Sequence, residues 1–157
     1  MINDEHNNRK QTILGAGGSI GIELAKCLKD YTSDIRLVNR NPTKINSTDQ
    51  LFPADLTKKE DIFKAIDGSH VTYVTIGFPY KTKVWKQTWV PFIQNVIAAC
   101  LEHNSKLVFF DNVYAIGGDN VNHLKENSPI RKKKKKGEIR AEVDRLILAN
   151  IDKNNLQ

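Results

Sequence analysis

Cysteine is scarce in this sequence, and no long apolar run is present. The 157 residues include two cysteines, Cys27 and Cys100, whose spacing matches neither a metal site nor a disulfide framework. Both fall on apolar positions of expected helices, which favours reduced thiols in the core of a cytoplasmic protein. No apolar run approaches the ~20 residues that a membrane-spanning helix needs. We therefore expect no membrane span, no bound metal and no disulfide.

Basic residues outnumber acidic ones: the sequence has 24 basic and 18 acidic residues, which gives a net charge of +6. Such an excess suits a protein that binds nucleic acid. However, six basic residues form one run, Arg131–Lys136, and the other charges balance at 18 of each sign. A run of this kind is typical of a solvated loop. Nucleic-acid binding is therefore the weakest of the functions considered.

The chain is long enough for one domain with its own core. Residues 1–10 are polar and charged and lack the apolar centre of a signal peptide, so we expect a disordered lead-in. Residues 11–157 alternate strand-like and helix-like segments, which predicts a doubly wound α/β domain with a parallel sheet. With right-handed crossovers, the strand order is 3-2-1-4-5.

The expected elements follow from hydrophobic periodicity. The expected strands are 12–14, 35–38, 51–55, 71–76 and 106–110, and the expected helices are 19–29, 58–66, 84–103 and 138–149. Thr57 and Glu60 match a capping box, and Pro91 should bend or break the long helix. The fifth strand is almost wholly apolar and is expected to be central. Residues 111–137 are expected to form a loop.

A glycine-rich stretch, Thr12–Gly21, organises the rest of the chain. It reads TILGAGGSIG, so an apolar run leads into four glycines and the start of a helical pattern. A helix N-terminus carries unpaired N–H groups and partial positive charge, and it therefore attracts a pyrophosphate. Glycine is needed where the backbone touches such a ligand, because a Cβ would hold the phosphate away.

These glycines follow the pattern G-x-x-G-x-x-G, from Gly15 through Gly18 to Gly21. Between a strand and a helix, the pattern predicts a dinucleotide site. The alternative is a glycine-rich turn without a ligand. The residues expected to contact the cofactor here are Gly15, Gly17, Gly18, Ser19, Ile20 and Gly21.

Asn39 and Arg40 follow the second expected strand, where a dinucleotide site usually has an acidic residue for the ribose 2′-hydroxyl. No carboxylate stands there to repel a phosphate, and an arginine makes a bidentate contact with one. We therefore predict that both residues bind cofactor and that NADP(H) is preferred to NAD(H). NAD remains the alternative cofactor. Gly77, after the fourth expected strand, is a further candidate for close approach to the dinucleotide, although it also fits a plain turn.

The glycine pattern in this strand–loop–helix context resembles the extended and atypical short-chain dehydrogenase/reductase superfamily, of the NAD-dependent epimerase/dehydratase type. The resemblance spans Thr12 to Leu148 and implies an NAD(P)-binding Rossmann fold. It also implies that Asp55 and Leu56 match the Asp-Leu that the family places beside the adenine. A role for Asp55 at the start of a helix is the equal alternative.

The same resemblance implies a changed catalytic centre. The family's fifth strand ends in Ser or Thr, and here Asp111-Asn112 stands in that place. When the last expected helix is aligned with the family's Tyr-x-x-x-Lys motif, Lys136 stands at the Tyr position and Arg140 at the Lys position. Arg140 would then hold the nicotinamide ribose. Asp111 and Tyr114 are the local candidates for a substitute proton relay. The alternative is that Asp111 only caps a loop and that Tyr114 is only a packed aromatic ring.

Two functions are therefore open. The first is hydride transfer at a carbonyl or alcohol carbon of an unidentified small molecule or nucleotide sugar, by a reductase or an epimerase/dehydratase relative. The second is a non-catalytic, NADP-binding redox sensor. Family members of the extended type continue for a stretch as long as this chain, so we expect the C-terminal substrate domain to be missing here. A homo-oligomer is an open alternative to a monomer.

Overall fold

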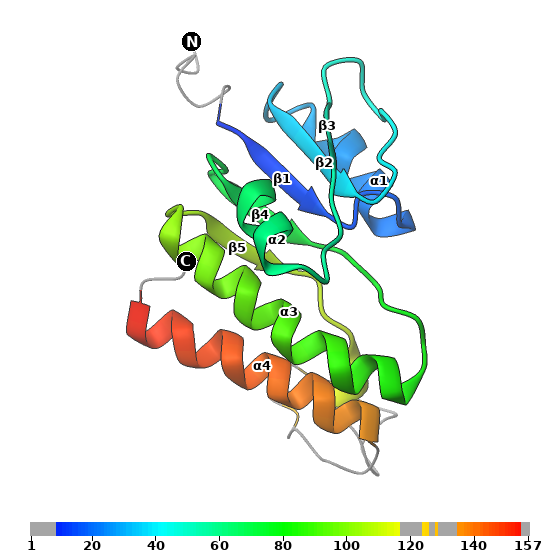
Figure 1. Ribbon diagram of the computed structural model, residues 1–157, viewed down its shortest axis with the longest axis vertical. Coiled ribbons are helices and arrows are strands. Elements are labelled where there is room, and N and C mark those ends of the chain that lie inside the picture. The colour runs from blue at the N-terminus through cyan, green and yellow to red at the C-terminus, as the bar shows by residue number, and fades with distance from the viewer. Residues whose placement is uncertain (1–8, 117–123, 126–127, 129–134, 155–157) are drawn as a thin grey trace.

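The computed structural model describes residues 9–116, 124–125, 128 and 135–154 (Figure 1). The strands are β1 (Gln11–Leu14), β2 (Ile35–Asn39), β3 (Gln50–Pro53), β4 (Val71–Val74) and β5 (Lys106–Phe109). The helices are α1 (Ser19–Leu28), α2 (Lys59–Ile66), α3 (Thr82–Glu102) and α4 (Lys135–Asn154), with a short 3-10 turn, η2 (Val113–Ala115). Helices separate the strands as the sequence predicts, except between β2 and β3, where the fully described stretch 40–49 contains no helix.

The five strands form one parallel sheet in the order β3-β2-β1-β4-β5, which confirms the predicted fold and strand order. β1 is central, and its Gln11 is in register with Ile35 of β2 and Val71 of β4. The chain leaves β1 toward β2 and later returns to β4 on the other side. The carboxyl ends of β1 and β4 therefore border the switch point, where an open α/β sheet binds its ligand.

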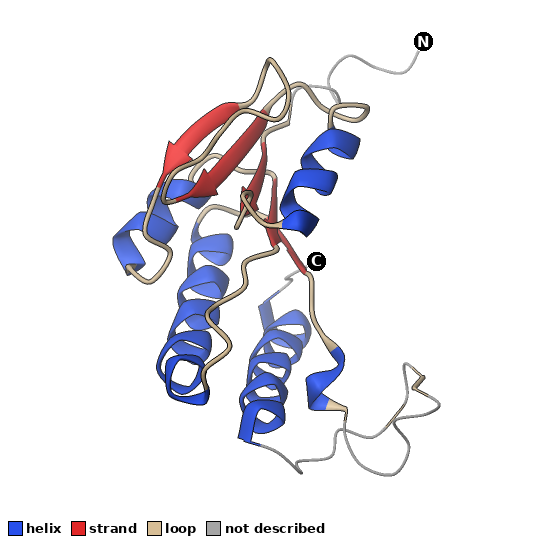
Figure 2. Cartoon of the chain, turned by 90° about the vertical axis from the view of Figure 1, so that its right-hand side faces the viewer, coloured by secondary structure: helices blue, strands red, loops and turns tan. Residues whose placement is uncertain are grey.

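The sheet separates two hydrophobic clusters of unequal size. Figures 1 and 2 show α1 on one face of the sheet and α2, α3 and α4 on the other. Successive strand residues point to opposite faces, so Leu14 packs with α2, α3 and α4, while Ile13 packs with α1. Trp89, Phe92 and Ile93 of α3 are the large side chains at the centre of the first cluster. One face of the sheet is thus covered by three helices and the other, among the described residues, by α1 alone.

The amino end of the domain lies earlier than the predicted boundary. Residues 1–8 of the expected lead-in fall outside the described residues. Arg9 and Lys10 already belong to the fold, because the Lys10 carbonyl accepts a 2.8 Å hydrogen bond from His70 N. The Arg9 carbonyl likewise accepts one from Thr32 Oγ1. No helix in the described part of the chain is both long enough and apolar enough to cross a membrane.

The predicted break at Pro91 is wrong, since α3 continues through it. A proline in a helix leaves the carbonyl four residues earlier without its N–H partner. That carbonyl belongs to Gln87, and both Gln87 and Pro91 are exposed. Water can therefore satisfy the carbonyl, and the packed face of the helix is undisturbed.

Two described parts of the loop predicted for 111–137 are helical. One is η2, and the other is the start of α4, which begins at Lys135 and runs to Asn154 rather than covering 138–149. The end of the basic run thus belongs to a helix, which lysine favours, while 131–134 lie outside the described residues. Lys136 gains a contact there: its Nζ lies 2.9 Å from the ring centroid of Tyr80.

β5 lies at the edge of the described sheet, so the prediction of a central strand is wrong. Val108 is 45% exposed and Phe110, just after the strand, 58% exposed. Cys27 of α1 is also exposed, contrary to the expectation of a core thiol, and so is Ile20 of the same helix. The buried face of α1 is formed instead by Gly21, Ala25 and Leu28. An apolar groove of about 380 Å³ is left between α1 and the β4–β5 part of the sheet.

Candidate functional site

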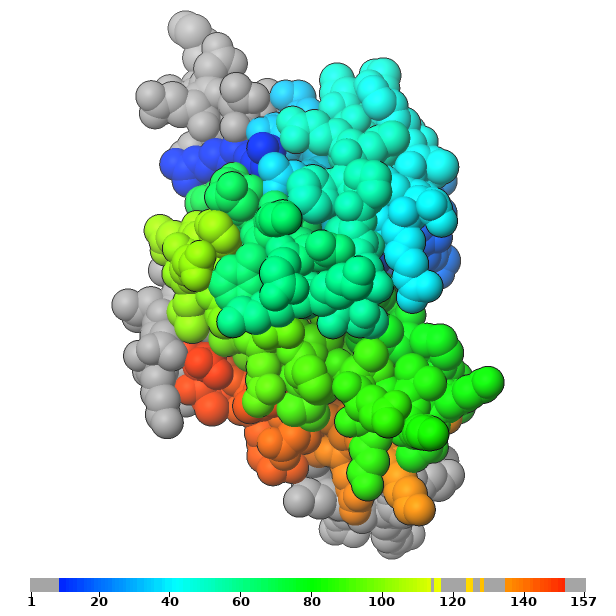
Figure 3. All heavy atoms as spheres, in the orientation of Figure 1, coloured from blue at the N-terminus to red at the C-terminus, as the bar shows by residue number. Residues whose placement is uncertain are grey.

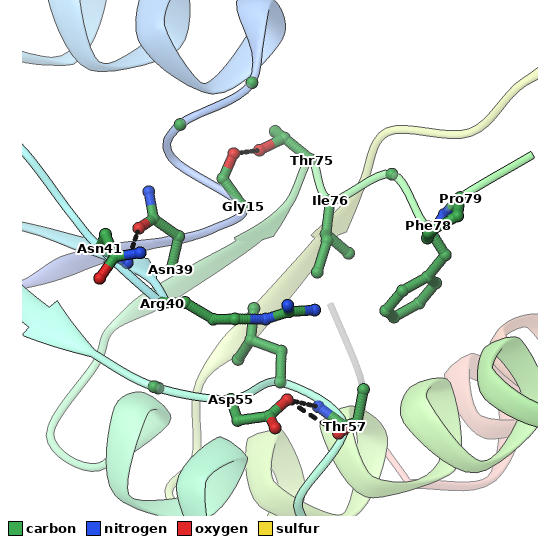
Figure 4. A pocket seen from close by; sticks show the side chains of 15 residues that line it. Gly15, Asn39, Arg40, Asn41, Asp55, Thr57, Thr75, Ile76, Phe78 and Pro79 are labelled. Carbon is green, nitrogen blue, oxygen red and sulfur yellow. Dashed lines mark hydrogen bonds between the residues drawn. The ribbon is translucent and has the colours of Figure 1, made fainter.

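A cleft of about 370 Å³ opens at the carboxyl ends of β1, β2, β3 and β4, and Figure 4 shows its lining side chains. The space-filling view in Figure 3 shows the face of the molecule on which α2, α3 and α4 lie. The predicted cofactor-binding residues that line the cleft are Gly15, Gly17, Gly18, Asn39, Arg40, Asp55, Leu56 and Gly77. They come from four separate loops, and the parallel sheet brings those loops to one edge. Ser19, Ile20 and Gly21 do not line the cleft but form the first turn of α1, directly after the glycine loop.

Two of the glycines are required by the fold itself. Gly15 has a φ of +97°, and a Cβ on it would lie 2.5 Å from the Cα of Ile76. Gly21 is equally confined, since its Cβ would lie 2.7 Å from the Gly15 carbonyl oxygen and 2.8 Å from the Cα of Ala16. Glycine at these two positions lets the β1–α1 loop pack closely against both the start of α1 and the loop after β4.

Gly18 and Gly77 differ from that pair, because no described part of the protein requires them to be glycine. A Cβ on Gly18 would come no closer than 3.6 Å to another atom, and one on Gly77 would meet nothing within 4 Å. Gly18 also has ordinary extended angles, with φ of −82° and ψ of 161°. Both glycines border the cleft, so the space that a side chain would fill is the space available to a bound molecule.

The N-terminus of α1 is ready to receive an anion. Gly18 is its N-cap, no side chain caps the helix, and the first turn holds no acidic residue. The first N–H groups of a helix have no intrahelical acceptor, and the helix dipole favours negative charge there. Together with the open space at Gly18, this arrangement fits the pyrophosphate of a dinucleotide.

Arg40 supplies positive charge to the cleft. Its side chain extends from the end of β2 across the opening, between Ile76 and Asp55 (Figure 4). The neighbouring Asn39 accepts a 2.7 Å hydrogen bond from the backbone N–H of Asn41 through its side-chain oxygen. The end of β2 therefore presents a guanidinium and an amide, with no carboxylate.

Asp55 faces Arg40 from the loop after β3, and Thr57 holds its carboxylate. Thr57 donates to the same Asp55 oxygen from its hydroxyl at 2.8 Å and from its backbone N–H at 3.1 Å. These bonds, with a smaller contribution from Arg40, lower the pKa of Asp55. The predicted capping box is wrong, because the N-cap of α2 is Lys58 and no side chain caps the helix. Thr57 instead fixes an acceptor at the cleft.

Arg140, predicted to hold the nicotinamide ribose, is not among the described residues that line the cleft. Its side chain is 1% exposed and is paired with the carboxylate of Asp111. Its guanidinium carbon lies 4.3 Å from the ring centroid of Trp89 and 4.9 Å from that of Phe109. The arginine is thus a buried element between α3, β5 and α4.

Asp111, a predicted catalytic residue, opens on a different cavity. That cavity, of about 440 Å³, lies between β5, η2 and α4 and shares no lining residue with the cleft. Asp144 of α4 also lines it. Burial and the adjacent Asp111 carboxylate raise the pKa of Asp144 to about 7, against the opposing effect of Arg140. Three charged groups therefore interact with one another at this end of the molecule.

Lys136 and Tyr114 are the other two residues considered for the catalytic centre. Lys136 donates a 3.2 Å hydrogen bond to the backbone carbonyl of Tyr80, over whose ring it lies. Tyr114 belongs to η2, and its side chain lies outside the described part of the structure. The structure thus brings most of the predicted cofactor residues together at the cleft, whereas Asp111 opens on another cavity.

Sequence reasoning missed part of the cleft, and it missed Asp144, the second carboxylate near the buried arginine. The missed lining residues are Asn41, Ala54, Thr57, Thr75, Ile76, Phe78 and Pro79. All of them lie just after β2, β3 or β4, and this position is the signal that could have identified them as lining residues. Asp144 lies four residues after Arg140, a spacing that puts two side chains on one helix face.

A parallel sheet in this order, with an uncapped helix behind a glycine loop at the switch point, defines a dinucleotide-binding Rossmann domain. The chain belongs to the NAD(P)H-binding family, whose profile matches residues 15–148. This match and the architecture confirm the resemblance drawn from the glycine pattern. No curated protein sequence matches the chain.

Solved structures share the fold at low sequence identity. A mutant uronate dehydrogenase from Agrobacterium tumefaciens complexed with NAD has a TM-score of 0.82 and 18% identity, over 94% of this chain and 58% of its own. L-threonine dehydrogenase from Clostridium difficile has a TM-score of 0.81 and 16% identity, over 96% and 51%. UDP-N-acetylglucosamine 4-epimerase from Methanobrevibacter ruminantium M1 has a TM-score of 0.79 and 14% identity, over 96% and 53%. The chain thus spans between half and three-fifths of the length of these proteins.

Proposed function

We propose that this chain is the NADP(H)-binding domain of an oxidoreductase or nucleotide-sugar epimerase/dehydratase relative. The observation that carries the proposal is the cleft itself: a glycine loop with free space, an uncapped helix N-terminus and one arginine at the end of β2. The loop and the first turn of α1, including Ser19, Ile20 and Gly21, would receive the pyrophosphate. Arg40 and Asn39 would bind the ribose 2′-phosphate.

The other cleft residues complete the assignment. Asp55 and Leu56 would lie beside the adenine, and Gly77 would allow close approach of the second ribose. When bound, the nicotinamide would supply or accept a hydride at a carbonyl or alcohol carbon. The dehydrogenase and epimerase names of the structural neighbours support a small-molecule or nucleotide-sugar substrate. We place this activity in the cytoplasm, in a monomer or a homo-oligomer.

The preference for NADP(H) is tested by replacing Arg40. We expect NADPH to bind the protein at least tenfold more tightly than NADH does. Arg40→Ala should weaken NADPH binding by about 10- to 100-fold, the value of a charge-assisted contact, and leave NADH binding unchanged. Arg145→Ala, which removes an exposed arginine on α4, is the matched control. An Arg40→Ala protein that keeps its preference for NADPH rules out this assignment.

A second function is binding without turnover, as in a redox sensor. It is favoured by one observation, the burial of Arg140 against Asp111 away from the cleft. The two functions separate in one assay, in which NADPH and a panel of carbonyl compounds and nucleotide sugars are incubated with the protein. Loss of the NADPH absorbance indicates an enzyme. Binding of NADPH with no loss of absorbance indicates the sensor.

A further inference from the structure

Lysines from two helices that are far apart in the sequence gather at one end of the molecule. Lys81, Lys83 and Lys86 belong to the start of α3, and Lys135 and Lys136 belong to the start of α4. Lys136 is half-buried and the other four are exposed. Figures 1 and 3 show the starts of the two helices side by side at the lower right of each view. These five residues are called the lysine cluster below.

Contacts between the two helices hold the lysine cluster on one surface. Lys136 Nζ donates a 3.2 Å hydrogen bond to the backbone carbonyl of Tyr80, just before α3, and lies over its ring. Lys86 and Lys135 line one groove of about 290 Å³ between α3 and α4. The fold therefore joins the last two residues of the basic run to three lysines that the sequence places elsewhere.

The lysines of α3 stand where a helix favours acidic residues. Lys81 is the N-cap of α3, no side chain caps the helix, and its first turn holds no acidic residue. The first turn of α2, by contrast, contains Glu60 and Asp61. The helix dipole opposes positive side chains at an N-terminus, so these lysines do not stabilise α3. A sequence that departs in this way from the stable pattern is typical of a functional site.

Little acidic charge offsets the lysine cluster. Glu138 is the acidic residue in the first turn of α4. Glu142, one turn later, is paired with Arg145 at 2.7 Å. Among the described residues of the two helix starts, five positive charges thus face one glutamate, and the N-terminal N–H groups of α3 add partial positive charge. This surface fits a partner with several closely spaced negative charges.

We propose that the lysine cluster binds the phosphate backbone of a nucleic acid without reading its base sequence. This function goes beyond the proposed NADP(H) site and does not depend on it. A lysine contacts a phosphate as a point charge, and each phosphate that is neutralised releases a condensed counterion. Because the counterions gain freedom, several neighbouring lysines are enough for binding.

The surroundings of the lysine cluster favour a nucleic acid over an anionic membrane. A helix that lies on a membrane turns large apolar side chains toward the lipid. In the first half of α3, Trp85 and Trp89 are 4% and 3% exposed and pack into the core. The exposed ring of Tyr80 has Lys136 over it. The surface therefore offers charge to a partner rather than apolar side chains for insertion.

The test measures binding of the full chain to a fluorescein-labelled DNA duplex of about 20 base pairs, by fluorescence anisotropy. We expect a Kd of about 1–10 μM at about 50 mM salt. Affinity should fall by about 100-fold between about 50 and 200 mM salt, because about four exposed lysines each replace a counterion. A scrambled duplex of the same length should bind equally well.

Two double variants locate the binding surface. Lys83→Glu combined with Lys86→Glu should weaken duplex binding by at least about tenfold. Lys58→Glu combined with Lys59→Glu is the matched control, because it changes the net charge equally but at the start of α2. The control should weaken binding by less than about threefold. Both variants should keep their affinity for NADPH within about twofold of the parent value.

The outcomes separate this proposal from the NADP(H) function. If the parent protein does not bind the duplex at low salt, or if the two double variants lose affinity equally, the lysine cluster is not a nucleic-acid site. Tighter binding to phosphatidylserine vesicles than to the duplex would also overturn the proposal. If saturating NADPH displaces the duplex, the nucleic acid lies in the cleft and the proposal is wrong. A parent protein that binds the duplex but no NADPH would refute the NADP(H) function alone.

Discussion

The two ends of the sheet's carboxyl edge contrast in how they use charge. At the β1–β2–β4 cleft, Arg40 reaches into open space and the glycines leave room for a ligand. At the β5–α4 end, Arg140, Asp111 and Asp144 face one another and the arginine is buried. Side chains that satisfy one another hold a fold together, whereas groups left open toward a cleft are available to a ligand. The contrast therefore separates a binding region from a structural one.

The largest effect is expected within the glycine loop. Gly15→Ala should lower the free energy of unfolding by about 3 kcal/mol, because it combines a positive φ with overlap against the backbone of Ile76. Gly77→Ala is the matched control and should change stability by less than about 0.5 kcal/mol, since its Cβ has room. Urea unfolding of both variants measures the difference. Equal losses of stability would remove the distinction between fold glycines and ligand glycines.

The buried pair gives the next largest effect. Arg140→Met should lower the free energy of unfolding by about 2 kcal/mol, because it leaves Asp111 and Asp144 without their counter-charge. The loss is smaller than for a fully buried pair, since Asp111 retains partial contact with water. Affinity for NADPH should remain within about twofold of the parent value. A tenfold loss of affinity at unchanged stability would return Arg140 to the nucleotide site.

The smallest effect concerns pH. The pKa of Asp144 is raised to about 7, whereas an unfolded aspartate titrates near ~3.9. The folded protein therefore holds a proton that the unfolded chain has released between these values, and stability falls as pH rises through that window. Asp144→Asn should remove this dependence and gain about 1 kcal/mol at pH 8, a value reduced for solvent screening. An unchanged pH profile of urea unfolding would contradict the coupling of the two carboxylates.

The fold was predictable because its signals are local and repeated. Alternating strand and helix patterns, with one glycine loop, are enough to give the strand order. The exposure of β5 was harder to predict, since an apolar strand such as Lys106–Phe109 does not reveal whether a neighbouring element covers it. Val108 is apolar and yet nearly half exposed. Hydrophobicity alone cannot tell an edge strand from a central one.

The site was likewise predictable only in part. Asn39, Arg40 and Gly77 could be assigned because parallel strands end at a common edge. Phe78 lies at that edge too, but a phenylalanine carries no chemical signal for a binding site. The contacts of Arg140 could not be predicted, because a helix register gives a position in the fold but not the partner. That partner, Asp111, is 29 residues away, and only the folded chain brings the two together.

The central claim is that the open space at Gly18 is where a nucleotide's phosphates lie. It is tested most directly by titrating NADPH into the parent protein and into Gly18→Ala, with urea unfolding of both. We predict that the parent protein binds NADPH, and that Gly18→Ala unfolds at the same denaturant concentration but binds at least about tenfold more weakly. A parent protein that gives no heat with NADPH, or a variant that binds equally well, would contradict the account.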